Sequence, residues 1–116
     1  MRGPKSSISP HDLYFGLGTA AAPTVVDVRD GSAFASADRL LVGATYQHPD
    51  QVDHWRSSLP PGRPVIAYCE HGNEVSQSVT AALQTAGIDA AFLEGGIAAW
   101  KDAGLPTRRN IGVTPS

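Results

Sequence analysis

The chain has 116 residues, of which 41% are hydrophobic and 17% are charged, and its formal net charge is −2. This balance is typical of one globular domain, and the charge gives no sign of nucleic-acid binding. A single cysteine excludes an internal disulfide and a zinc site of several cysteines. It also favours a reducing compartment. No apolar run approaches the roughly 20 residues that span a membrane, and the first ten residues lack the apolar centre of a signal peptide. We therefore expect a cytoplasmic protein that does not bind membranes.

The spacing of apolar residues, Pro and Gly predicts alternating helices and strands. Residues 1–7 are rich in Gly, Pro and Ser, and we expect them to form a flexible leader. Ser9-Pro10 is typical of a helix start, with Ser as the N-cap and Pro in the first turn. Periodicity, β-branched residues and breakers place the other elements. We expect helices or turns at 11–17, 31–37, 49–59, 76–86 and 97–103, strands at 24–30, 40–45, 65–68 and 88–93, and a C-terminal tail at 108–116.

This alternation predicts an α/β fold with a mostly parallel sheet. In such sheets, ligands gather beyond the carboxyl ends of the strands. The first strand carries Asp27 and Arg29 at its carboxyl end, where their side chains would point the same way on an extended chain. We interpret this pair as a structural network that ties the strand end to a neighbouring loop. A direct part in the chemistry is the alternative.

The only cysteine, Cys69, lies between the predicted strand 65–68 and the predicted helix 76–86. Backbone N–H groups and the helix dipole favour an anion at such a place, and the same surroundings favour the thiolate form of a cysteine. Gly72 suits a curled loop because Gly readily adopts positive φ. We therefore interpret the loop that starts at Cys69 as the active site, with Cys69 as the catalytic nucleophile. The alternative is a buried, inert cysteine.

Three stretches, in this order, resemble the signatures of rhodanese-like sulfurtransferases. They are Val26–Arg29, Tyr68–Asn73, and Leu93–Trp100 followed by Ala103–Pro106. The resemblance implies a single rhodanese-like domain at 8–107, with three layers, α/β/α, and a mostly parallel central sheet of about five strands. The segment 39–44 departs from the family and matches well only at Gly43-Ala44. The run 71–77 is similar to a bacterial subgroup associated with chromate resistance, an association that states no mechanism.

The resemblance implies that Cys69 takes a sulfane sulfur from a donor such as thiosulfate and holds it as a persulfide. The sulfur then passes to a thiophilic acceptor, either a small molecule or a sulfur-accepting protein, with no cofactor and no metal. Preorganised backbone N–H groups would stabilise the anion. His71 either donates a hydrogen bond or is simply exposed, and Asn73 is expected to make the turn. The substrate-binding candidates are Glu70, His71, Gly72, Asn73, Glu74, Val75 and Ser76, with Asp27 and Arg29 in support.

Glu74 stands where the family often has Arg or Ser. A carboxylate there would repel an anionic donor, so Glu74 points away, pairs with a cation, or makes thiosulfate a poor donor. We expect weak activity with thiosulfate. A Cys-dependent phosphatase or arsenate reductase is a less favoured alternative, because such enzymes need an Arg six residues after the Cys to hold an oxyanion, and Val75 stands there. A non-enzymatic persulfide carrier or binding module is the other alternative.

Overall fold

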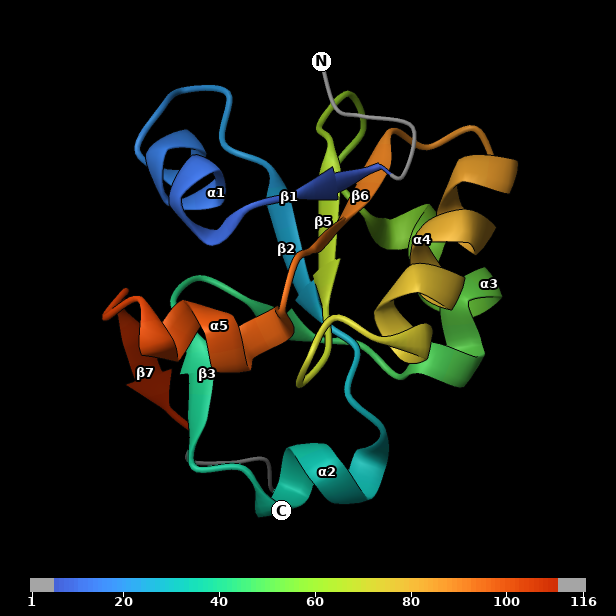
Figure 1. The fold of residues 1–116 in the computed structure, drawn as a ribbon. Helices are drawn as coiled ribbons and strands as arrows, with labels where there is room; N and C mark the ends of the chain where they lie inside the picture. Colours follow the sequence, from blue (N-terminus) through green and yellow to red (C-terminus); the bar gives the residue numbers. More distant parts are fainter. Residues whose placement is uncertain (1–5, 111–116) are drawn as a thin grey trace.

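Strand β5 (Val65–Tyr68) lies in the middle of a five-stranded sheet in which all pairings are parallel (Figure 1). The computed structural model describes residues 6–110. The strand order is β1-β6-β5-β2-β4, which confirms the expected α/β fold with a mostly parallel sheet. The other strands of the sheet are β1 (Ser7–Ile8), β2 (Thr24–Asp27), β4 (Thr45–Tyr46) and β6 (Ala90–Leu93).

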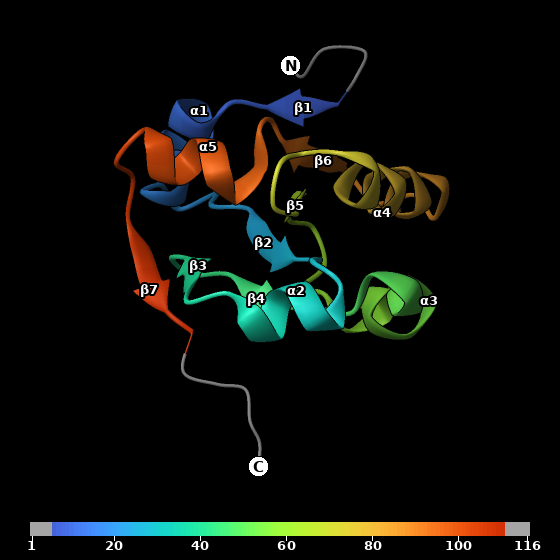
Figure 2. The same ribbon diagram turned by 60° about the horizontal axis from the view of Figure 1, so that its bottom comes forward.

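Helices cover both faces of the sheet (Figure 2). Helices α1 (Pro10–Leu17) and α5 (Gly96–Asp102) lie on one face. Helices α3 (Val52–Trp55) and α4 (Glu74–Thr85) lie on the other. Within residues 6–110, no helix combines the length and the apolar character needed to cross a membrane. The remaining helices are α2 (Gly31–Ser36) and the 3-10 turns η1 (Pro49–Gln51) and η2 (Arg56–Ser58).

Alternation along the strands divides the core into two halves. Successive side chains of a strand point to opposite faces, so Val25 packs with α1 and α5, whereas Val26 packs with α3 and α4. Trp100 of α5 is fully buried in the first half. Trp55 of α3 is buried in the second half, and its Nε1 donates to the carbonyl oxygen of His48. Both faces of the sheet are therefore closed, and its strand ends remain for a site.

Short strands at both ends of the chain were not predicted. Strand β1 begins at the last residue of the expected leader, and β7 (Thr107–Arg109) runs from the last residue of the expected domain into the expected tail. The segment expected as one strand at 40–45 splits into β3 (Arg39–Leu41), which pairs antiparallel with β7, and β4. Strands of two or three residues show no periodicity in the sequence. Residues 1–5 of the leader and 111–116 of the tail lie outside the described residues.

Helix α5 begins directly against the loop that follows β5. Ile97 donates its backbone N–H to the carbonyl oxygen of Cys69, and Ala98 donates to that of Glu70, each at 3.0 Å. The approach requires glycine at position 96, because an added Cβ would overlap both of these carbonyl oxygens. The backbone of Gly96 also has φ +62°, in the left-handed region that disfavours other residues.

We predict that Gly96→Ala destabilises the fold by about 2–5 kcal/mol, the sum of left-handed strain and overpacking. The matched control is Gly104→Ala at the other end of α5. Gly104 has φ +73° but open space around its Cα, so only the strain of about 1–2 kcal/mol applies. Urea denaturation of both variants measures the difference. Equal loss of stability would contradict the close approach of α5 to the loop.

Candidate active site

Cys69 lies immediately beyond the carboxyl end of β5 and is buried, with 6% of its surface exposed. Its thiol donates a hydrogen bond to Oγ of Ser76, with Sγ and Oγ 3.2 Å apart. Ser76 is fully buried in the first turn of α4, and its hydroxyl lies 3.4 Å from the carbonyl oxygen of Asn73. The sulfur is thus packed against a polar group that can both donate and accept a hydrogen bond.

The carbonyl groups of the loop are tied to the helices on either side of it. Those of Cys69 and Glu70 accept from the start of α5, as described above. The carbonyl of Gly72 accepts from the side-chain amide of Gln77 at 2.9 Å, and that of Asn73 accepts from the backbone N–H of Gln77 at 3.2 Å. Hydrogen bonds therefore fix the direction of four peptide groups in this loop.

Fixed carbonyls also fix the N–H groups of the same peptides. The described chain contains no cis peptide bond, and in a trans peptide the N–H points opposite to the C=O. The N–H groups of residues 70, 71, 73 and 74 therefore point away from the helices that hold the carbonyls. Among the hydrogen bonds of residues 6–110, none gives an acceptor to a backbone N–H of residues 70–76. The loop thus offers donors that the chain itself does not use.

Two glycine contacts hold the loop in this shape. Gly72 has φ +73°, as expected for the curled part of the loop. An added Cβ at Gly72 would lie 2.7 Å from the backbone nitrogen of Gly95, in the turn before α5. Asn73 precedes the first residue of α4, and its side chain makes no capping hydrogen bond. The positive φ of the turn therefore lies at Gly72, next to Asn73, whose place in the turn and at the substrate stays a prediction.

Asp27 and Arg29 form a buried ion pair behind the loop. Their closest oxygen and nitrogen atoms are 2.6 Å apart, and the two residues are 0% and 3% exposed. The hydroxyl of Tyr68 donates to the Asp27 carboxylate at 2.9 Å and accepts from the backbone N–H of Leu41 at 3.1 Å. Arg29 also donates to the carbonyl oxygen of Arg39. The pair thus joins the ends of β2, β5 and β3, in agreement with the interpretation as a structural network.

The contacts with Asp27 favour the charged form of the Arg29 guanidinium. Burial opposes the charged guanidinium, but the hydrogen bonds and the charge of Asp27 outweigh it and raise the pKa of Arg29. Burial, followed by the charge of Asp27, raises the pKa of Tyr68, so its hydroxyl keeps its proton. A second nitrogen of Arg29 lies 3.4 Å from Oε1 of Glu70 in the loop. The guanidinium of Arg29 therefore contacts two carboxylates, those of Asp27 and Glu70, and its charge is already paired within the chain.

The remaining loop side chains are turned to solvent. His71, Asn73, Glu74 and Val75 are exposed. Among residues 6–110, no ion pair involves Glu74, so pairing with a cation does not explain its presence. Val75 stands where a phosphatase-type loop needs its oxyanion-binding Arg. The described chain also holds no group of three or more His, Cys, Asp or Glu side chains that could bind a metal ion.

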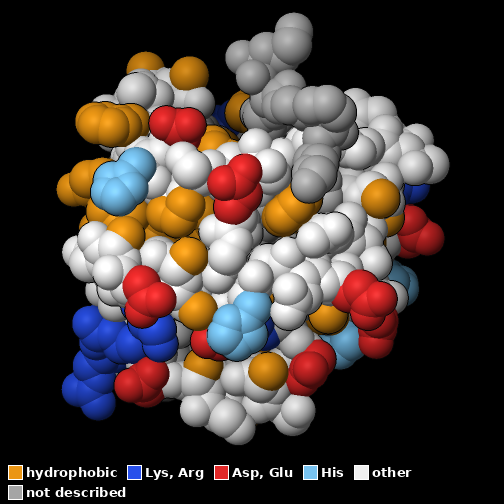
Figure 3. Space-filling view, viewed as in Figure 1, with side chains coloured by type: hydrophobic (Ala, Val, Ile, Leu, Met, Phe, Trp, Pro, Cys, Tyr) orange, Lys and Arg blue, Asp and Glu red, His pale blue; other side chains and the backbone are white. Residues whose placement is uncertain are grey.

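Positive charge gathers away from the loop. In the orientation of Figure 1, Lys and Arg cluster at the lower left, over β3 and β7, whereas acidic side chains are scattered over the rest of this face (Figure 3). The β3–β7 ladder contains Arg39, Arg108 and Arg109. Of these, Arg39 bonds to Thr107, and Arg108 bonds to the carbonyl oxygen of Ala44. Basic side chains therefore do not gather around Cys69.

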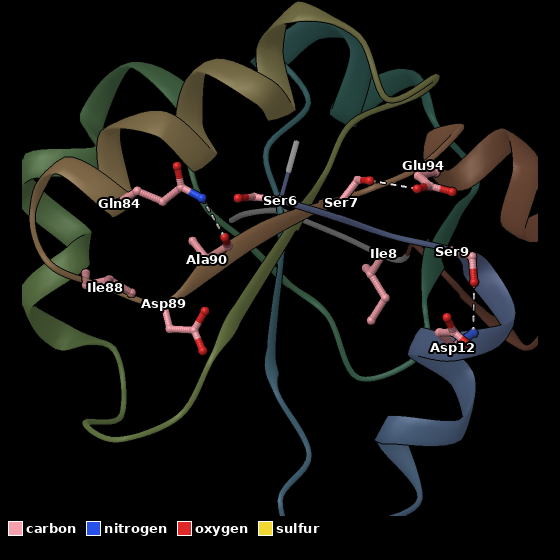
Figure 4. A pocket seen from close by; sticks show the side chains of 10 residues that line it. All are labelled: Ser6, Ser7, Ile8, Ser9, Asp12, Gln84, Ile88, Asp89, Ala90 and Glu94. Carbon is pink, nitrogen blue, oxygen red and sulfur yellow. Dashed lines mark hydrogen bonds between the residues drawn. The ribbon is translucent and has the colours of Figure 1, made fainter. Parts of the chain in front are cut away.

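A large cavity along the edge strand β1 does not include Cys69 among its lining residues (Figure 4). Its volume is about 1030 Å³, and none of its lining residues is a cysteine or a histidine. Its polar groups already bind within the chain: Ser7 donates to Glu94, and the Gln84 amide donates to the carbonyl oxygen of Ala90. The loop at Cys69, which holds the only cysteine, remains the candidate site.

Sequence reasoning missed two parts of this arrangement. It treated Ser76 only as a backbone donor, whereas its buried hydroxyl touches the sulfur. It also missed Tyr68, although a tyrosine at the end of a fully buried strand needs a partner for its hydroxyl. The need of this hydroxyl for a hydrogen-bond partner could have indicated that Tyr68 belongs to the buried network. Neither partner, Asp27 nor the backbone of Leu41, is near Tyr68 in the sequence.

The chain is similar to a set of known proteins. An uncharacterized protein of Synechocystis sp. is 32% identical over 90 residues, which make up 74% of this chain and 47% of that protein, so the chain spans about half the length of this curated relative. A rhodanese-like domain protein of Staphylococcus aureus is 29% identical in sequence, with a TM-score of 0.72, and the match covers 87% of this chain and 96% of that one.

A solved structure titled thiosulfate sulfurtransferase, from Pseudomonas aeruginosa, is 26% identical, with a TM-score of 0.77. The match covers 89% of this chain and 19% of that one, so the likeness concerns one part of a larger protein. A family model described as the rhodanese-like domain matches residues 9–103. These residues include four of the five strands of the parallel sheet, β2, β4, β5 and β6, and the whole loop at Cys69. The chain therefore belongs to the rhodanese-like domain family.

Proposed function

We propose that this chain is a sulfurtransferase that carries a sulfane sulfur as a persulfide on Cys69. The observation that carries the proposal is the loop itself. Its carbonyls are bound to α4 and α5, and its N–H groups lack acceptors within the described chain. Preorganised N–H donors of this kind stabilise a negatively charged sulfur without a metal or a basic side chain. The family, and the Pseudomonas aeruginosa protein titled thiosulfate sulfurtransferase, support the same reaction class.

The proposed reaction has two displacements at sulfur. With thiosulfate as the donor, the Cys69 thiolate attacks the outer sulfur, the S–S bond breaks, and sulfite leaves with the electron pair. A nucleophilic acceptor then attacks the terminal sulfur of the persulfide, and the Cys69 thiolate leaves. Each step starts and ends with the same total charge. The N–H groups of residues 70–76 therefore face a single negative charge on sulfur throughout the cycle.

The Ser76 hydroxyl adds a donor that can turn. In the thiol form, Sγ donates to Oγ of Ser76. A thiolate has no proton to donate, so the hydroxyl then has to rotate and donate to the sulfur. Its present acceptor, the carbonyl oxygen of Asn73, lies at 3.4 Å and also accepts from Gln77, so little is lost in the rotation. Ser76 thus suits both protonation states of Cys69.

The charges around the loop make thiosulfate a poor donor. Glu70 and Glu74 belong to the loop, and Arg29 is already held by Asp27 and Glu70. A dianion that approaches Cys69 therefore meets negative side chains and no free guanidinium. We propose that the preferred donor carries less negative charge, such as a persulfide. The run 71–77 is similar to the chromate-resistance-associated subgroup, and we propose that the chain is related to it, although this similarity specifies no reaction.

Incubation with a polysulfide or a persulfide is expected to add about 32 Da, the mass of one sulfur, at Cys69. Intact-protein mass spectrometry followed by peptide mapping measures the gain, and treatment with cyanide should remove it as thiocyanate. Cys69→Ser is the control and should gain nothing. No gain with any of polysulfide, persulfide or thiosulfate would overturn the proposed function.

Ser76→Ala is expected to slow the alkylation of Cys69 by iodoacetamide at neutral pH about tenfold. This loss corresponds to one hydrogen bond to a charged sulfur, about 1.4 kcal/mol. Ser78→Ala is the matched control, because Ser78 lies two residues further along α4 and is exposed. Equal alkylation rates for both variants and the unaltered protein would contradict the role of the Ser76 hydroxyl.

Replacement of Glu74 is expected to raise kcat/KM for thiosulfate:cyanide sulfur transfer, severalfold in Glu74→Gln and about tenfold in Glu74→Arg. The physical reason is the loss, and then the reversal, of a charge that repels the donor. Asp102→Asn tests for a general effect of net charge, because Asp102 is exposed at the far end of α5. If neither Glu74 variant gains activity, repulsion by Glu74 does not limit the use of thiosulfate.

A further inference from the structure

A cavity of about 320 Å³ lies beside the active-site loop, and the proposed reaction has not yet used it. We call it the loop-side cavity. It lies between the first turns of α4 and the segment formed by η1 and α3. Its volume is in the range of small-molecule sites. Its lining residues are Asp30, Pro49, Asp50, Val52, Glu74, Val75, Ser78, Val79 and Ala82.

The loop-side cavity shares two residues with the segment that leads from Cys69 into α4, although Cys69 and Ser76 themselves do not line it. Two of its lining residues, Glu74 and Val75, belong to the active-site loop and the first turn of α4. The next residue, Ser76, contacts Sγ of Cys69 at 3.2 Å. A third wall residue, Asp30, follows the carboxyl end of β2, which pairs with β5 in the sheet. A ligand in this cavity would therefore lie at the edge of the sheet where Cys69 is located.

The chemistry of the cavity walls is apolar with an acidic rim. Five of the nine lining residues are Pro, Val or Ala, and three are Asp or Glu, with no Lys, Arg or His among these described residues. Val75 adds an exposed apolar side chain, with 36% of its surface accessible. A molecule that fits these walls has a short hydrocarbon portion and a positive charge, because apolar area is buried favourably and a cation complements the carboxylates.

The carboxylates of the rim form no salt bridge with a Lys or Arg of the described chain, and His48 has only a minor electrostatic effect at Asp30. Hydrogen bonds from the Ala33 N–H and the Ser32 hydroxyl lower the pKa of Asp30. The salt bridges within residues 6–110 include neither Asp50 nor Glu74. Arg29, next to Asp30 in the chain, is held by Asp27 and Glu70. The negative potential of the rim is therefore open to a ligand.

We propose that the sulfur acceptor is a small thiol that carries a protonated amine, and that it binds in the loop-side cavity. This inference rests on the proposed function. The ammonium group lies at the carboxylates of the rim, and the methylene groups lie against the valines. The thiolate of the acceptor attacks the terminal sulfur of the Cys69 persulfide, the S–S bond of the persulfide breaks, and Cys69 leaves as a thiolate. The acceptor departs as a persulfide and keeps its ammonium proton.

The test compares three thiols of similar size and different charge: cysteamine, 2-mercaptoethanol and mercaptoacetate. The protein is first loaded with sulfur at Cys69, and the transfer rate to each thiol is then measured. Because the thiols differ in intrinsic reactivity, the quantity compared is the selectivity, which is the rate with cysteamine divided by the rate with 2-mercaptoethanol. Comparison of the same ratio between protein variants cancels the intrinsic difference.

We expect the selectivity for cysteamine to fall severalfold in Asp50→Asn and about tenfold in Asp50→Asn/Glu74→Gln, while the relative rate with mercaptoacetate rises. Added salt should lower the selectivity of the unaltered protein, because it screens exposed charges. Asp53→Asn is the matched control, because Asp53 is exposed on α3, pairs with Arg56 and does not line the cavity. This variant should keep the original selectivity.

Two results would overturn the inference and leave the proposed function in place. One is equal selectivity in the unaltered protein and in both Asp50 variants. The other is a Cys69 that gains one sulfur but transfers it to none of the three thiols. A Cys69 that never gains sulfur overturns the proposed function, and the acceptor site falls with it. The mass of the loaded protein, measured first, distinguishes these cases.

Discussion

Two backbone hydrogen bonds, from the first turn of α5 to the carbonyls of Cys69 and Glu70, determine what the active-site loop can do. A carbonyl held by α5 turns the N–H of the same peptide to the opposite side. The first N–H groups of α5, which have no partner within the helix, thus orient the peptide groups of the loop at Cys69. Glycine at positions 72 and 96 is the condition for this contact, because a side chain at either would meet backbone atoms of the opposite segment.

The buried ion pair of Asp27 and Arg29 has a second consequence for the site. A buried pair is costly to form, and its net contribution to stability is small. Its structural value lies in the number of segments that it joins, since the Tyr68 hydroxyl and the backbone of Arg39 bind to it, and the Tyr68 hydroxyl in turn accepts from the backbone N–H of Leu41. Its electrostatic effect is different, because the guanidinium of Arg29 beside the loop is already paired with Asp27. The surroundings of Cys69 are therefore poor in cations, although the proposed reaction gives its sulfur a negative charge.

Local patterns in the sequence were enough to predict the elements that carry the site. The apolar run 65–68 became β5 without change, and Gly87 has φ +86° after α4, as expected for a helix end. Helix α4 begins two residues earlier than predicted, at Glu74. This shift places Glu74 and Val75 in the first turn, beside a cavity whose other walls come from η1 and α3. No local pattern brings together segments that are distant in the chain.

The same limit applies to the contacts made by side chains. Asp27 and Arg29 could be paired from the sequence, because residues two apart on an extended chain share a side. The tie between the loop and α5 could not, because it joins backbone groups that are 28 residues apart in both pairs. The motif resemblance located both segments correctly but said nothing of how they touch. Contact between distant backbones depends on the packing of the whole sheet, and sequence reasoning had no access to that.

Stabilisation of the sulfur and choice of its partners are physically separate in this site. Backbone N–H groups cannot lose their protons, and those of residues 70, 71, 73 and 74 are fixed in direction, so in the proposed reaction they would stabilise a charged sulfur whatever molecule supplied it. The carboxylates of Glu74, Asp30 and Asp50 lie at the mouth of the site and act over a longer range on charged visitors. Substitution at the rim can therefore change which donors and acceptors are used without a change in how the persulfide is held. In the reaction proposed above, a rhodanese-like loop with fixed amides accepts many partners, and the charge of its rim selects among them.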